Sequence, residues 1–118
     1  MDSNIKTAAS LLRNASGNLQ NHIRELHADE TNIHHHESQT EKNFRSDLLR
    51  TELRLADSNG DTSSTTYLVR RVFDLRKRRN QAKEAAARKI SDEEMEIHSL
   101  QQQINKLNDL AHMLEMWR

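Results

Sequence analysis

A polar stretch, Asp57-Ser-Asn-Gly-Asp-Thr-Ser-Ser-Thr-Thr66, divides the chain into two arms. Asn, Gly, Asp and Ser gather at turns because they tolerate turn geometry or cap helices with their side chains. Apolar residues recur at helical spacing on both sides of this stretch. We therefore expect a turn at residues 58–65, a first arm at about residues 3–57 and a second arm at about residues 66–117.

The composition is that of an all-α protein. The 118 residues include two Gly and no Pro, which is too few turn residues for a β-rich or α/β domain. There is no Cys either, so disulfides, thiolate zinc sites and cysteine nucleophiles are excluded. The start, Met-Asp-Ser-Asn, lacks the basic and apolar regions of a secretory signal, and we expect a cytoplasmic protein.

Both arms carry a heptad seam, in which apolar residues alternate three and four positions apart. The first arm reads Ile5, Ala8, Leu12, Ala15, Leu19, His22, Leu26, Asp29, Ile33, His36, Thr40, and then Phe44, Leu48, Thr51, Leu55. The second arm reads Leu68, Val72, Leu75, Arg79, Ala82, Ala86, Ile90, and then Ile97, Leu100, Ile104, Leu107, Ala111, Leu114. Such seams predict that two helices pack together as in a coiled coil.

Folding the arms back at Gly60 matches large apolar residues along most of their length. In this register Leu48 meets Leu75 and Leu55 meets Leu68. We therefore predict one helical domain over residues 1–118, built as a long antiparallel helical hairpin.

A compact four-helix bundle is the alternative. It needs extra breaks at residues 29–38 and at Ile90, where Ser91-Asp-Glu-Glu94 has the form of a capping box. Neither place contains Gly or Pro.

A hairpin of two helices buries one stripe on each helix, which is marginal for stability. Several apolar residues lie off the seam and need a cover, and they are Leu11, Ile23, Leu49, Leu53, Val69, Phe73 and Met113. A second copy of the chain is the favoured cover, so we expect a homo-oligomer and most simply a dimer. A partner protein is the alternative.

The formal net charge of zero hides a strong asymmetry. Residues 42–89 hold 13 Lys and Arg against six Asp and Glu, which leaves +7 there and −7 elsewhere. The predicted contact residues for an anionic partner are Arg70, Arg71, Arg76, Lys77, Arg78, Arg79 and Lys83. An acidic protein, including the acidic half of a second copy, and nucleic acid phosphates both fit such a segment.

The seam also contains a predicted polar layer. His22, Asp29 and His36 are seven residues apart, and the register places Asp29 opposite Glu93. Two facing carboxylates repel each other unless a proton or a cation intervenes. We therefore consider a pH-sensitive or partner-specifying layer, with fraying of the helix as the alternative.

Nothing in the chain predicts catalysis. Two Gly cannot form a phosphate-binding loop, there is no Gly-x-Ser-x-Gly elbow, and the seven His residues do not form a His-Glu-x-x-His motif. We expect no catalytic residue, no cofactor, no metal site, no small-molecule substrate and no membrane span. The predicted function is a non-enzymatic interaction and assembly protein. Nucleic-acid association through the 70–89 segment is one alternative, and a small helical chaperone or adaptor that binds client helices near Met113, Met116 and Trp117 is another.

Overall fold

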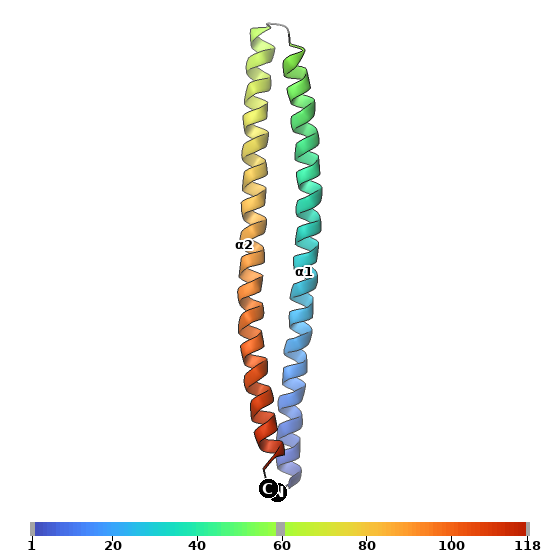
Figure 1. The fold of residues 1–118 in the computed structure, drawn as a ribbon, viewed down its shortest axis with the longest axis vertical. Coiled ribbons are helices and arrows are strands. Elements are labelled where there is room, and N and C mark those ends of the chain that lie inside the picture. The colour runs from blue at the N-terminus through green and yellow to red at the C-terminus, as the bar shows by residue number, and fades with distance from the viewer. Residues whose placement is uncertain (1, 59–60, 118) are drawn as a thin grey trace. The chain divides into compact units, whose positions relative to one another are not determined.

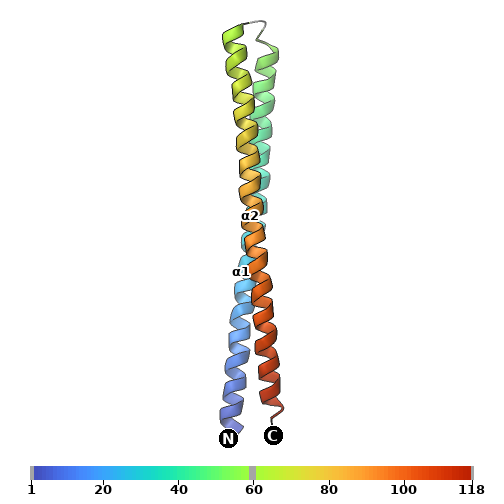
Figure 2. The same cartoon turned by 90° about the vertical axis from the view of Figure 1, so that its left-hand side faces the viewer.

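The structure is a computed structural model that describes residues 2–58 and 61–117, with Asp2 described by its backbone alone. It contains two helices, α1 (Asp2–Ala56) and α2 (Thr62–Glu115). The two helices run antiparallel, as the two views in Figures 1 and 2 show. The predicted all-α helical hairpin is therefore confirmed.

The alternative four-helix bundle is wrong. Helix α1 continues without interruption through residues 29–38, and α2 continues through Ile90 and Ser91. The capping-box sequence Ser91-Asp-Glu-Glu94 therefore does not start a new helix, because the residues before it stay helical. Without Gly or Pro at these two places, the backbone hydrogen bonds continue from one turn to the next.

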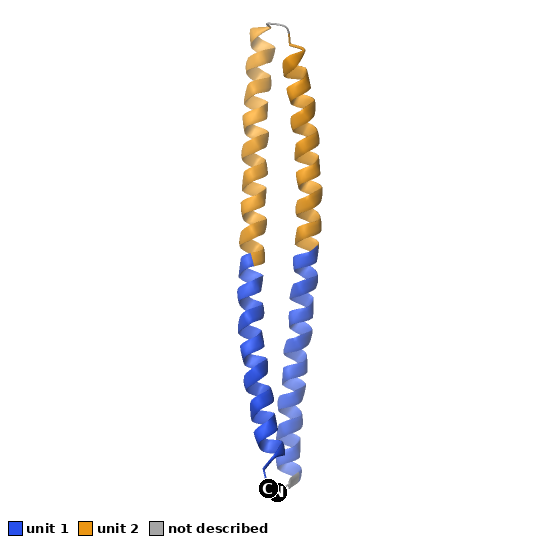
Figure 3. Ribbon diagram, viewed as in Figure 1, with its two compact units in different colours: residues 1–31, 91–118 blue, residues 32–90 orange. Residues whose placement is uncertain are grey.

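The contacts of the chain group into two units (Figure 3). Unit 1 combines residues 1–31 with residues 91–118, and unit 2 comprises residues 32–90. Each unit pairs a segment of α1 with a segment of α2.

Unit 2 has a small core close to the turn. Leu48, Val72 and Leu75 are buried against one another, and Phe44 packs against this cluster. The predicted meeting of Leu48 with Leu75 is thus confirmed. Thr51 is also buried, and its hydroxyl donates a hydrogen bond to the Asp47 carbonyl at 2.7 Å, so that burial leaves its polar group satisfied.

In unit 1 every second position of the predicted α1 seam lies one residue further along the chain, while Leu12, Leu19 and Leu26 stay partly buried as predicted. Ala9 is 3% exposed and Ser16 is 2% exposed, whereas the preceding predicted seam residues are half-buried. Likewise Ile23 is half-buried and His22 is exposed. A heptad seam can space its residues four and then three positions apart as well as three and then four. Counted from Ile5, the first spacing places Ile23 in the seam, where the second would place His22.

The second helix begins at Thr62, four residues before the predicted start. Asp61 caps it, because its carboxylate accepts hydrogen bonds from the Ser63 N–H at 3.2 Å and from the Ser64 hydroxyl at 2.8 Å. These hydrogen bonds, first that from the Ser64 side chain, hold the pKa of Asp61 below its ordinary value. Gly60, where the fold-back was predicted, lies outside the described residues.

Ser16 provides a test of the corrected seam. Its buried hydroxyl makes no hydrogen bond, so Ser16→Ala removes an unsatisfied polar group and adds a better helix former. We expect the free energy of unfolding to rise by roughly 1 kcal/mol in urea titrations followed by circular dichroism. The exposed Ser10 is the matched control, and Ser10→Ala should gain only the helix-propensity part, about 0.5 kcal/mol. A loss of stability in Ser16→Ala would contradict the corrected seam.

The Asp61 cap predicts a pH dependence. A carboxyl whose pKa is lowered by folding stabilises the folded state above its unfolded pKa, and this contribution disappears as the pH falls through the folded pKa. Asp61→Ala should therefore lower the thermal midpoint at neutral pH and make little difference in strong acid. Asp61→Asn keeps a capping oxygen and should retain most of the midpoint at neutral pH. An unchanged midpoint in Asp61→Ala at neutral pH would show that the cap contributes nothing.

Candidate interaction surface

All seven predicted contact cations lie on α2 in unit 2, but they do not share one face. Several of them make ion pairs within the unit. Arg76 Nη2 lies 3.4 Å from Glu52 Oε1, and Arg78 Nε lies 3.2 Å from Asp74 Oδ2. Exposed ion pairs of this kind contribute between about 0 and 1 kcal/mol each, so a partner can rearrange them at small cost.

Arg70, Arg71 and Lys77 form the free part of the basic segment. All three are exposed, and no carboxylate among the described residues lies within ion-pair distance of them. Their charges are therefore uncompensated by close contacts. They are the residues of the predicted set that are best placed to meet an external anion.

Glu41 is the acidic centre of unit 2, and the sequence analysis missed it. Its Oε2 atom lies 3.8 Å from Arg79 Nε and 3.6 Å from Lys83 Nζ, and its Oε1 atom lies 3.9 Å from Arg45 Nη2. Glu41 Oε2 and Arg79 Nε are buried and form no hydrogen bond with each other. The spacing of Glu41 and Arg45, four residues apart on one helix, was the one available signal.

A groove of about 440 Å³ lies beside Glu41 within unit 2. Ile33 and Phe44 line it from α1, and Ala82 and Ala86 line it from α2. Alanine at these seam positions leaves space where a larger side chain would fill the interface between the helices.

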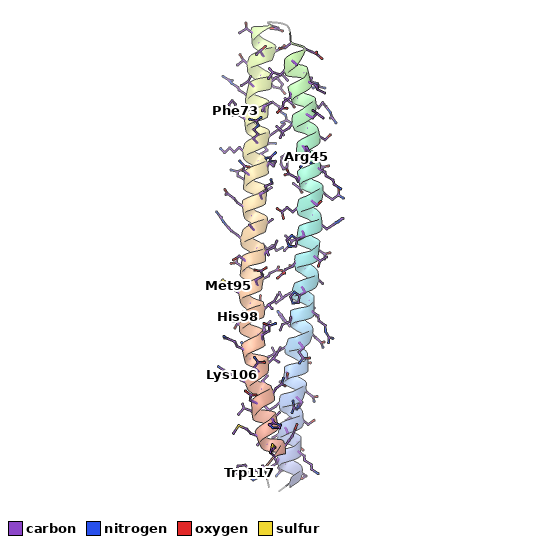
Figure 4. The ribbon with its side chains drawn as sticks, viewed as in Figure 1. Arg45, Phe73, Met95, His98, Lys106 and Trp117 are labelled. Atoms are coloured by element: carbon purple, nitrogen blue, oxygen red, sulfur yellow. The ribbon has the colours of Figure 1, made fainter. Side chains whose placement is uncertain are left out.

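An apolar face is exposed on one side of unit 2. We call Leu49, Leu53, Val69 and Phe73 the unit 2 apolar face, and their exposed fractions run from 36% to 67%. Leu49 and Leu53 are four residues apart on α1, as Val69 and Phe73 are on α2, where Figure 4 labels Phe73. Leu49 lines a shallow groove with Glu52 and Arg76, and Phe73 lies three residues before Arg76. Leu49 and Phe73 therefore lie next to the same Arg76–Glu52 contact, and Leu53 and Val69 lie one turn away from them on their own helices.

Unit 1 carries a second exposed apolar face, formed by Leu11, Leu110 and Met113, which we call the unit 1 apolar face. His22 Nε2 lies 3.2 Å from Glu96 Oε1 and links one side of α1 to one side of α2. Leu11 lies eleven residues before His22, and Leu110 lies fourteen residues after Glu96, so both follow the same helical stripes as this pair. Met113 follows Leu110 by three residues on that stripe.

The predicted polar layer is not assembled as expected. His22 is exposed and contacts Glu96, while His36 is exposed in unit 2. Asp29 is half-buried and Glu93 is buried, both in unit 1. Because this seam position lies one residue further along the chain than predicted, Glu30 takes it in place of Asp29, and Glu30 Oε1 is buried without a hydrogen bond. The helix does not fray here, because α1 is continuous.

The two units carry net charges of opposite sign. Unit 2 holds 13 of the 18 Lys and Arg residues and eight of the 18 Asp and Glu residues, a net charge of +5, and unit 1 therefore carries −5. In unit 1, Arg13 of α1 and Glu115, the last residue of α2, form a bidentate ion pair at 2.9 and 3.0 Å. This pair raises the pKa of Arg13 and lowers the pKa of Glu115.

Within residues 2–58 and 61–117, no three His, Asp or Glu side chains are grouped so that they could hold a metal ion. Neither described helix has a stretch that is apolar enough to cross a membrane. Comparison of the chain with protein-family models, curated proteins and solved structures finds no match. The charges and exposed apolar faces described above are therefore the features of the molecule that bear on its function.

Proposed function

We propose that this protein is a non-enzymatic helical assembly protein that self-associates and presents the basic surface of unit 2 to an acidic partner. The observation that carries the proposal is the combination of free cations and exposed apolar side chains in one unit. Arg70, Arg71 and Lys77 have no carboxylate within ion-pair distance among the described residues, and large apolar residues nearby stay exposed. Apolar patches bordered by charge are typical of protein-binding surfaces.

Self-association is assigned to residues outside the heptad seam. The hairpin itself already uses the seam, since Leu48, Val72 and Leu75 are buried within one chain. Of the apolar residues that stay exposed, which also include Tyr67, Met95, Met116 and Trp117, we assign the unit 2 apolar face and the unit 1 apolar face to the second chain. Covering them adds the buried apolar area that two helices alone lack.

Nucleic-acid association is the second candidate function. Arginine contacts phosphate with two parallel hydrogen bonds, and Arg70 and Arg71 are exposed and free to do so. The segment lacks interleaved aromatic residues, so contacts would go to the phosphate backbone and not to stacked bases.

We expect Arg70→Glu/Arg71→Glu to weaken binding of a labelled poly-glutamate peptide by at least about tenfold at low ionic strength, because two attractive contacts become repulsive. Fluorescence anisotropy measures the affinity. Lys6→Glu/Arg24→Glu is the matched control, since it reverses the same number of exposed cations in unit 1. It should keep the wild-type affinity.

An equal loss of peptide affinity in both variants would show that only the net charge of the protein matters. It would contradict a binding surface on unit 2. Duplex DNA of equal charge is the comparison probe. Tighter binding of the duplex with a steep salt dependence would favour the second candidate function.

A further inference from the structure

We infer that the acidic partner of unit 2 is unit 1 of a second copy of this chain. This inference rests on the proposed function and identifies the partner of its basic surface. In the inferred dimer the unit 2 apolar face of one copy packs on the unit 1 apolar face of the other. The two chains then run antiparallel to each other.

The charges favour the same pairing. Unit 2 carries +5 and unit 1 carries −5, so unit 2 against unit 2 is repulsive while unit 2 against unit 1 is attractive. Lys42 and Lys77 are exposed and border the unit 2 apolar face, seven residues before Leu49 and four residues after Phe73. These two lysines are cations for the partner's carboxylates, since neither has an ion pair among the described residues.

Matching carboxylates lie on the corresponding side of unit 1. Glu25 follows His22 by three residues, and Asp92 precedes Glu96 by four residues, so both share the side on which His22 meets Glu96. Both are exposed and make no ion pair within the described residues. A two-fold dimer uses this contact twice, because unit 1 of the first copy meets unit 2 of the second in the same way.

A charge exchange between copies tests the inference. One variant is Lys42→Glu/Lys77→Glu in unit 2, and the other is Glu25→Lys/Asp92→Lys in unit 1. Sedimentation equilibrium at low ionic strength measures the dimer affinity of each variant alone and of an equimolar mixture. Circular dichroism checks that each variant keeps its helix content, and all four residues are exposed and make no ion pair with a described residue.

We expect the wild type to be a dimer and each variant alone to dimerise at least about tenfold more weakly, because like charges then face each other in both contacts. The mixture should recover the wild-type affinity, since each variant supplies the charge that the other lacks. A second readout is Leu53→Asp, which should weaken the dimer at all salt concentrations. Leu53 is 58% exposed in the single chain, so the hairpin itself tolerates the change.

A wild-type monomer, wild-type affinity in both variants alone, or no recovery in the mixture would each overturn the inference. These outcomes are distinguishable from failure of the proposed function. If poly-glutamate binding still depends on Arg70 and Arg71 while the mixture fails to recover, unit 2 has an acidic partner and that partner is not a second copy.

Discussion

Two packed helices can bury only one stripe of side chains each, and the other properties of this protein follow from that limit. The buried residues form short clusters such as Leu48, Val72 and Leu75, while Phe73 and Leu49 remain more than half exposed. Hydrophobic burial scales with the apolar area removed from water, so a lone hairpin gains little of it. A surface that leaves such residues exposed is suited to assembly with further helices.

In the proposed assembly, electrostatics sets which units of two copies meet. Within unit 2, Glu41 gathers Arg79, Lys83 and Arg45 at 3.6 to 3.9 Å, which compensates part of the positive charge. Arg70, Arg71 and Lys77 make no ion pair with any residue that the structure describes, and unit 1 carries the opposite excess of charge. Apolar faces alone would tolerate several arrangements of copies, whereas charges of opposite sign in the two units favour one of them.

The sequence was sufficient to predict the hairpin and the pairing of Leu48 with Leu75, because heptad spacing and a single polar turn leave few alternatives. It could not determine which of two equivalent spacings α1 follows after Ile5. The choice depends on packing against α2, which buries Ala9 and Ser16 and exposes His22. The contacts of Glu41 with Arg79 and Lys83 could not be predicted from the sequence either, since they join residues about 40 positions apart and depend on the register of the two helices.

In the inferred dimer, unit 2 of one copy meets unit 1 of another. Zero-length cross-linking of a mixture of isotopically light and heavy chains tests this contact most directly, because carbodiimide joins lysine amines to carboxylates in contact and mixed-isotope products come from two chains. We predict mixed-isotope links between lysines of unit 2, such as Lys42 and Lys77, and carboxylates of unit 1, such as Glu25 and Asp92. Mixed-isotope links confined to pairs within unit 2, or no mixed-isotope links at all, would contradict it.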